Sequence, residues 1–292
     1  MNVELIYRLH RDEAFAKQFT APKYTTFVAM PFAKTAEYDA DEIYRLLKEQ
    51  VHVRANQLGK EAGLAKTFTP LQRVSENDGT ATIVTDSIAT RILEDHFFVG
   101  DLTGNNPGAV LETGAALALK PNHRLVLLTQ GGHRDLHFDV KVTFVNGYTA
   151  ATLVEDVAKG LVGAATAFEA ETKLFITEVS ASLTSDAILL LNRYGVLWAN
   201  RAPHTAPSLH EDPASCGERF AGADGKLRFQ QAIRELLHKR LLWTDYEANA
   251  VPGGDAYGAH ATKLGWRVIE NIWHNNAKMK EPEDSRTGPT PR

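Results

Sequence analysis

The sequence predicts a three-layer α/β domain with a parallel sheet, followed by a smaller α+β domain. Between residues 23 and 172, short apolar segments alternate with amphipathic helical segments, and parallel strands require such crossover connections. After about Thr184, the order changes to helices followed by two short strands. The chain has 292 residues, 43% of them hydrophobic, which is enough to form two cores of ordinary size.

The elements of the first domain, residues 23–172, follow from apolar periodicity. Each expected helix carries one apolar face, as Ile43, Leu47 and Val51 do in the first. Each expected strand is a short apolar run, which is typical of the covered sheet of a flavodoxin- or Rossmann-like domain. In chain order, the expected elements are strand Thr25–Met30, helix Ala40–Gln57, strand Thr67–Gln72, helix Ala81–Glu94, strand His96–Asp101, helix Pro107–Leu119, strand Arg124–Thr129, strand Val142–Val145 and a helix from Thr149 to about Glu171.

The second expected domain covers residues 173–277. Its elements are helix Ser185–Tyr194, helix Lys226–Arg240, strand Leu241–Asn249, a Pro-Gly-Gly-Asp turn at 252–255, strand Ala256–Ala261 and a helix through Trp273. Two helices, a two-stranded wing and a closing helix together describe a winged-helix domain. Outside both domains, residues 1–22 are expected to form a helical arm, and residues 278–292, rich in proline and charge, a disordered tail.

Composition excludes several classes of function. With 32 basic and 36 acidic residues, the net charge of −4 gives no overall attraction to nucleic acid or to an anionic membrane. Cys216 is the only cysteine, so a disulfide framework is excluded, and no metal site is expected. No signal core is present, and no apolar run approaches the ~20 residues of a membrane span. We therefore expect a soluble cytoplasmic protein.

One polar loop, together with the helix that follows it, carries the candidate chemistry. Asp101 ends an expected buried strand, the loop Leu102–Asn106 follows, and Asn106-Pro107 supplies a helix N-cap and a first-turn proline. Ligands bind at this edge of open α/β sheets. Glu112 then lies in the second helical turn, where we expect the helix dipole to help keep its carboxylate ionised.

These segments resemble the nucleoside 2-deoxyribosyltransferase superfamily over roughly Thr25 to Gln130. In that family the glutamate of a Glu-x-Gly motif is the nucleophile, a role that the resemblance gives to Glu112. An aspartate in the preceding helix contacts the base or the leaving group, a role that corresponds to Asp86. The resemblance rests on Phe27 to Phe32, Arg73, Asp86, Asp101 to Pro107 and Glu112 to Gly114. It implies catalytic roles for Glu112, Asp86 and Asp101, and substrate contacts from Met30, Pro31, Phe32, Arg73, Thr103, Gly104, Asn105 and Asn106.

The implied reaction is cleavage of an N-glycosidic bond. A carboxylate beneath the anomeric carbon stabilises an oxocarbenium-like transition state or forms a covalent glycosyl intermediate. A neutral base must be protonated to leave, which requires an acid such as Asp86 or Asp101. The transferases often have another acid where this sequence has Asn106, whereas nicotinamide in NAD leaves from a cationic ring without a proton. The sequence therefore favours hydrolysis of NAD or a related nucleotide over base exchange, with no cofactor.

The second domain suggests a setting for this reaction. Basic residues on the expected helix 226–240, among them Arg228, Arg234 and Lys239, indicate a modest surface for phosphates, although they could equally solvate a protein-contact helix. A deoxyribosyltransferase-like domain joined to a winged helix resembles effectors of retron anti-phage systems, in which the winged domain contacts a ribonucleoprotein. The resemblance implies a bacterial defence effector, and members of the superfamily are commonly homo-oligomers.

Other interpretations fit the same residues. The protein could be a base-exchanging transferase of nucleoside salvage, or a nucleotide sensor or DNA-binding regulator that binds without turnover. Glu112 could be a solvated helix residue, Asp101 a loop cap and Arg73 a surface cation. Asp86 could mark a helix start, and Met30-Pro31-Phe32 could be only a strand-ending turn.

Overall fold

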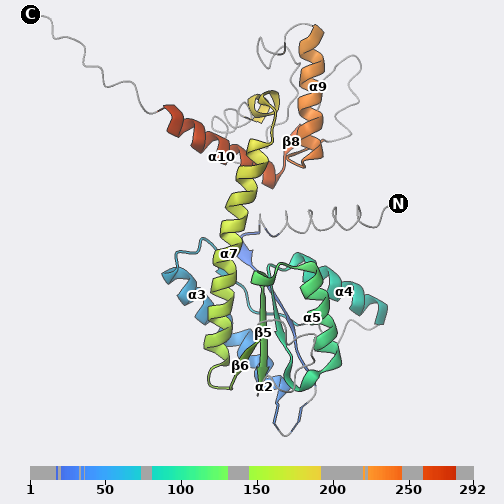
Figure 1. Ribbon diagram of the computed structural model, residues 1–292, viewed down its shortest axis with the longest axis vertical. Helices are drawn as coiled ribbons and strands as arrows, with labels where there is room; N and C mark the ends of the chain where they lie inside the picture. Colours follow the sequence, from blue (N-terminus) through green and yellow to red (C-terminus); the bar gives the residue numbers. More distant parts are fainter. Residues whose placement is uncertain are drawn as a thin grey trace, which may run out of the picture. The chain divides into compact units, whose positions relative to one another are not determined.

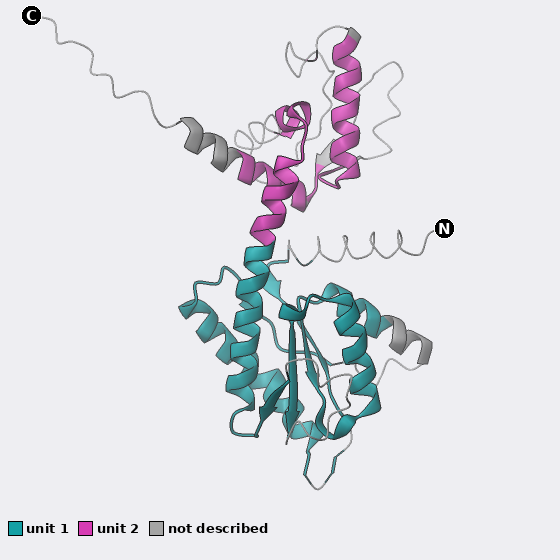
Figure 2. Cartoon of the chain, in the orientation of Figure 1, with its two compact units in different colours: residues 1–171 teal, residues 172–292 magenta. Residues whose placement is uncertain are grey.

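The computed structural model describes residues 18, 21–32, 34–35, 37–73, 81–130, 145–191, 220, 223–244 and 259–280. The chain forms two units, residues 1–171 and residues 172–292 (Figure 2). This division lies next to the boundary expected between residues 172 and 173. Helix α7, Leu153–Ala181, contributes residues to both units.

The first unit is built on a parallel sheet, as the alternation of elements predicted (Figure 1). Strands β2, β4, β5 and β6 pair in this order, all in parallel. β3 pairs in parallel with β1, and a bridge between Phe27 of β2 and Gln72 extends that pairing. This is the strand order of a doubly wound sheet. The bounds are β1 Lys23–Tyr24, β2 Thr26–Ala29, β3 Thr67–Phe68, β4 Phe97–Asp101, β5 Leu125–Gln130 and β6 Asn146–Tyr148.

Helices cover both faces of this sheet and form three layers (Figure 1). Successive strand residues point to opposite faces, so Val99 joins one core and Phe98 the other. Both faces of the strands are therefore buried, as their continuous apolar sequence predicted. The first face carries α2 Ala40–Leu46, the π-helical turn η1 Leu47–Val51, α3 His52–Glu61 and α7, and the second carries α4 Ala81–Glu94 and α5 Pro107–Leu119.

Three predicted bounds are corrected. The expected strand Thr67–Gln72 is limited to two residues of β3, since Pro70 lacks the N–H that a ladder requires. Helix α7 does not end near Glu171 but continues to Ala181, because no proline or glycine lies between them. The final strand lies at Asn146–Tyr148, and the expected positions 142–144 lie outside the described residues.

Close packing of α5 on β4 depends on Gly100. A Cβ atom at this position would lie 2.7 Å from Thr113 Oγ1, and 3.0 Å from side-chain carbons of Leu127 and Phe98. A real Cβ atom does not approach a neighbour as closely as 2.7 Å, so only glycine lets the helix that carries Glu112 lie this near the strand.

Gly100→Ala is therefore expected to lower the free energy of unfolding by about 1–3 kcal/mol, because the added methyl overpacks the strand–helix contact. Thermal unfolding of the full chain measures the effect. The matched control is Gly163→Ala in α7, where nothing lies within 4 Å of the Cβ position. Gly100→Ala and Gly163→Ala variants of equal stability would contradict the prediction.

The predicted N-terminal arm is described only at Gln18 and at residues 21–22. Gln18 is buried, and its side-chain amide donates to the carbonyl oxygen of Asp95 at 2.9 Å and accepts from Arg124 at 2.6 Å. His96 Nε2 lies 2.7 Å from the Gln18 carbonyl oxygen. These contacts hold Gln18 at the amino ends of the strands, opposite the edge where the candidate site is expected.

The second unit combines helices with a two-stranded antiparallel sheet. In α9, Phe229, Ile233 and Leu236 are buried, as their helical spacing predicted. Gly265 permits close packing, since a Cβ atom there would lie 2.0 Å from the carbonyl oxygen of Leu241. The described elements are a helix at Ser185–Leu191, α9 Ala223–His238, β7 Leu242–Thr244, β8 Ala259–Ala261 and α10 Lys263–Lys280.

The end of the second unit differs from its prediction. Helix α10 extends to Lys280, so the segment 278–292 begins in a helix rather than in a disordered tail. The turn expected at 252–255 and residues 281–292 lie outside the described part of the chain. Among the described residues, no single helix is both long and apolar enough to cross a membrane. Only α7 and Ser185–Leu191 taken together are, and this pair is bent by 115°.

Candidate functional site

The carboxyl edge of the sheet brings the predicted site loops together. β2 and β4 pair in parallel, with Ala29 opposite Gly100, so they end side by side. The Met30–Phe32 segment and the loop after Asp101 therefore leave neighbouring strands at one edge. Arg73 leaves the same edge on the other side of β2, because the residue before it bridges to that strand. In a sheet of this order, ligands bind at this switch point.

Asp101 is fully buried and accepts four hydrogen bonds. Its Oδ2 accepts from the hydroxyls of Tyr38 at 2.9 Å and Tyr148 at 2.7 Å. Its Oδ1 accepts from the backbone N–H of Thr103 at 3.1 Å and from the hydroxyl of Thr103 at 2.6 Å. Burial, followed by the Asp101 charge, raises the pKa of both tyrosines, so they remain donors. Both carboxylate oxygens thus hold the surrounding segments in place.

The loop from β4 to α5 is shaped by two residues with positive φ. Gly104 has φ 66° and Asn105 has φ 51°, a left-handed conformation that asparagine tolerates better than most residues. The Thr103 hydroxyl accepts from the backbone N–H of Gln130 at 2.8 Å, which fixes the loop to β5. Asn106 Oδ1 accepts from the N–H of Ala109 at 3.2 Å, with proline next in the chain, so the predicted helix start is confirmed.

Asn106→Ala is expected to lower the free energy of unfolding by about 1 kcal/mol, because the orphan N–H of Ala109 loses its acceptor. Asn106→Asp should cost little, since aspartate caps helices as well as asparagine does. Thermal unfolding of both variants beside the wild type tests the cap. If alanine and aspartate destabilise the chain equally, the cap has no energetic role.

Glu112 lies in the second turn of α5, and its side chain is partly buried. Among the described residues, its carboxylate has no hydrogen-bond or ion-pair partner. Burial raises its pKa to about 7. The expectation that the helix dipole keeps this group ionised is therefore corrected: the dipole acts within the first turn, and desolvation dominates beyond it. Near neutral pH the group exists in both its ionised and its neutral form.

Arg73 lies against two aromatic rings. Its guanidinium carbon lies 4.2 Å from the ring centroid of Tyr44 and 5.1 Å from that of Phe32. Its Nη2 atom lies 3.8 Å from a carboxylate oxygen of Asp41, whose side chain is 89% exposed, so this ion pair is weak. Its Nη1 atom is buried and has no hydrogen-bond partner among the described residues. A partly buried cation with an unused donor therefore lies at the site edge.

The other predicted residues divide into buried and accessible ones. Met30 and Pro31 are buried, and Met30 joins the core on the α2 and α7 face, whereas Phe32 is 47% exposed. Asp86 lies in α4, and its side chain lies outside the described part of the structure. The carboxyl edge thus brings together Phe32, Arg73 and the loop 103–106, with Glu112 on the helix that begins there.

Sequence reasoning missed four residues of this edge: Tyr38, Tyr44, Gln130 and Tyr148. Gln130 and Tyr148 are the last residues of β5 and β6, and a polar residue at the end of a parallel strand is a signal that could have found them. The Gln130 amide donates to the carbonyl oxygen of Glu37 at 3.2 Å, while its Oε1 is buried without a partner among the described residues. No comparable signal marks the two tyrosines near α2.

Two of the three predicted nucleic-acid contacts, Arg228 and Lys239, bind other residues of the second unit. Arg228 forms a bidentate ion pair with Asp186, at 2.9 and 2.7 Å. Lys239 donates to the carbonyl oxygen of Ser182 at 2.8 Å and to its hydroxyl at 2.7 Å. Arg234 is exposed. Of the three cations, Arg234 is therefore the one whose side chain has no hydrogen bond or ion pair to another described residue.

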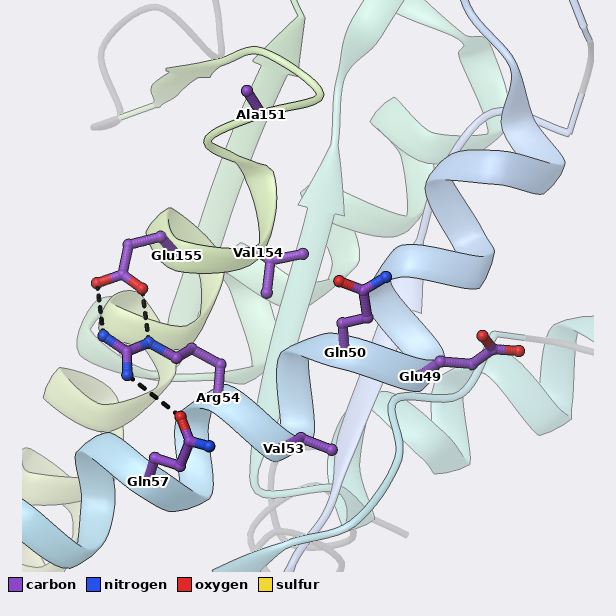
Figure 3. A pocket seen from close by; sticks show the side chains of 8 residues that line it. All are labelled: Glu49, Gln50, Val53, Arg54, Gln57, Ala151, Val154 and Glu155. Carbon is purple, nitrogen blue, oxygen red and sulfur yellow. Dashed lines mark hydrogen bonds and ion pairs between the residues drawn. The ribbon is translucent and has the colours of Figure 1, made fainter.

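A pocket of about 380 Å³ lies elsewhere in the first unit (Figure 3). It lies where η1 and α3 meet the start of α7. Two of its lining residues, Arg54 and Glu155, form an ion pair at 2.7 Å. None of the predicted site residues lines it. Its lining residues are Glu49, Gln50, Val53, Arg54, Gln57, Ala151, Val154 and Glu155.

Comparisons with protein-family models, with curated proteins and with solved structures give no match. Within the described residues, no cluster of histidine, cysteine, aspartate or glutamate side chains could hold a metal ion. Functional assignment therefore depends on the chemistry of the carboxyl edge.

Proposed function

We propose that the first unit is an N-glycosidase that cleaves NAD or a related nucleotide, with Glu112 as its nucleophile. The observation that carries this proposal is the contrast between two carboxylates. Asp101 is enclosed by four hydrogen bonds, whereas Glu112 has no partner among the described residues and a pKa raised to about 7. An unengaged carboxylate held on a helix can attack an anomeric carbon or stabilise an oxocarbenium-like transition state.

The remaining groups favour a leaving group that needs no proton. Asp101 is best assigned as a positioning residue, because its oxygens are buried and already accept from Tyr38, Tyr148 and Thr103. Asn106 caps α5 and supplies no acid. Asp86 in α4 is the remaining candidate acid. Nicotinamide leaves NAD from a cationic ring, so its departure requires neither an acid nor a second base. These features support hydrolysis over base exchange.

A substrate panel tests the proposal. The purified full chain is incubated with NAD, nucleoside monophosphates and deoxynucleosides, with and without a second free base, and the products are separated by chromatography. We expect release of free base from NAD or a nucleotide. A new nucleoside formed with the second base would indicate an exchanging transferase instead. A folded protein that releases no base from any of these substrates would contradict the proposal.

For the second unit, we propose a winged-helix domain that joins the enzyme to a nucleic-acid or ribonucleoprotein partner in bacterial defence. The order of its described helices and its antiparallel strands supports this interpretation. Because Arg228 and Lys239 bind Asp186 and Ser182 within the unit, Arg234 is the residue best suited to a phosphate.

A binding assay tests this role. It measures the affinity of the wild type and of Arg234→Gln for a labelled DNA duplex and an RNA–DNA hybrid at several salt concentrations. That the protein is cytoplasmic and that it forms a homo-oligomer remain predictions from the sequence.

A further inference from the structure

We propose that Arg73 is the phosphate subsite of the candidate active site and makes the enzyme select phosphorylated substrates over the corresponding nucleosides. The inference rests on the proposed function, because it names the substrate class of that same site. Arg73 directly follows Gln72, whose bridge to Phe27 places it at the carboxyl edge. It therefore lies at the edge of the sheet where a ligand is expected.

The guanidinium of Arg73 is restrained by contact with two aromatic rings. The rings of Tyr44 and Phe32 lie 4.2 Å and 5.1 Å from its central carbon, and its side chain is 18% exposed. A planar cation that is restrained in this way loses less freedom when it binds an anion. Restraint before binding lowers the entropy cost of binding a phosphate group.

The same guanidinium has unused capacity to donate hydrogen bonds. Nη1 is buried without a partner among the described residues, and the ion pair of Nη2 with the exposed carboxylate of Asp41 is long, at 3.8 Å. Buried donors are nearly always paired in proteins, so Nη1 is available to an acceptor that the described residues do not supply. Phosphate oxygens match the forked donors of arginine.

Glu112 and the Tyr44 ring that contacts Arg73 belong to opposite faces of the sheet. Glu112 lies on α5, which covers one face of the sheet, whereas Tyr44, which stacks on Arg73, packs with the core of the other face. To contact both side chains, a ligand would have to lie across the edge between β2 and β4. In a nucleotide, the anomeric carbon and the 5′-phosphate lie at opposite ends of the sugar. Glu112 would therefore act at one end while Arg73 holds the other.

Binding without turnover provides the first test. The full chain is titrated calorimetrically with ADP, and with adenosine as the ligand that lacks phosphate. Four proteins are compared: the wild type, Arg73→Met, Arg73→Lys and Arg54→Met. We expect Arg73→Met to weaken ADP binding at least about ten-fold, and Arg73→Lys to weaken it less, since lysine keeps the charge but loses the fork. Adenosine binding should not change. Arg54→Met is the matched control, because Arg54 pairs with Glu155 away from this edge.

Turnover provides the second test. The ratio of kcat/KM for NAD to that for nicotinamide riboside should fall about ten-fold or more in Arg73→Met and stay unchanged in Arg54→Met. Equal losses on both substrates, or unaltered ADP binding, would overturn the phosphate subsite and leave Arg73 a structural residue. A wild type that binds ADP through Arg73 but cleaves neither substrate would instead overturn the proposed function and leave the subsite standing.

Discussion

Glu112→Gln is expected to lower the rate of N-glycosidic bond cleavage at least ~10³-fold while leaving the fold intact. Glutamine has nearly the same shape, and among the described residues no hydrogen bond or ion pair of Glu112 is lost. What disappears is the carboxylate charge that attacks the sugar or stabilises its transition state. Glu112→Asp keeps the charge but withdraws it by one methylene, so a smaller loss is expected from that variant.

The raised pKa of Glu112 gives this prediction a pH dependence. Glu112 acts when ionised, so kcat of the wild type should rise between about pH 6 and pH 8. The free energy of unfolding changes with pH in the opposite direction to kcat. The unfolded chain loses this proton near the ordinary value of 4.5 and the folded chain near 7, so the free energy of unfolding falls as the pH rises across that window.

The same shift sets the size of the stability effect. The full shift corresponds to about 3 kcal/mol at most, and solvent screening of a partly exposed group reduces it to about 1–2 kcal/mol. Glu112→Gln, which has no titrating group at this position, should therefore be more stable than the wild type at pH 8 and closely similar to it at pH 4.5.

Thermal unfolding at the two pH values and assays with NAD measure these effects together. An inactive Glu112→Gln variant that is more stable at pH 8 would show that the wild type keeps an unfavourably buried carboxyl group for its chemistry. A variant that is less stable than the wild type at pH 8 would indicate a structural role for Glu112. Undiminished cleavage by the variant would remove Glu112 from the reaction.

The features that sequence could predict are those decided by neighbours along the chain. The Asn106-Pro107 pair determines the start of α5 locally, through one cap hydrogen bond and one fixed φ angle. The apolar runs at Phe97–Asp101 and Leu125–Gln130 predict buried parallel strands, because each is short and bounded by polar residues. Both predictions agree with the structure, in which α5 begins at Pro107 and β4 and β5 are buried parallel strands.

The features that sequence could not predict depend on contacts between distant segments. Asp101 meets Tyr38 from 63 residues earlier and Tyr148 from 47 residues later, so its hydrogen bonds follow from strand order rather than from any motif. The contacts of Arg73 with Phe32 and Tyr44 likewise require three separate segments. The raised pKa of Glu112 is a consequence of how closely its helix packs, which no residue pattern shows.

Asp101→Asn is expected to be the most destabilising of the substitutions considered, by about 2–4 kcal/mol. Asparagine keeps the size of the side chain but replaces one acceptor oxygen with an amide donor. That donor would face either the hydroxyls of Tyr38 and Tyr148 or the N–H and hydroxyl of Thr103, and all of these now donate. Because the site is fully buried, water cannot replace the missing acceptor.

A mutant cycle separates this network from a general packing defect. In a Tyr38→Phe/Tyr148→Phe background the two donors are gone, so adding Asp101→Asn should cost less than it does in the wild type. The tryptophans Trp198, Trp243, Trp266 and Trp273 all lie in residues 172–292, so their fluorescence follows the second unit, while far-UV circular dichroism follows both. We expect the dichroism transition to shift to lower urea concentration more than the fluorescence transition does. Equal costs of Asp101→Asn in the two backgrounds would mean that the hydrogen bonds of Asp101 do not organise this edge of the sheet.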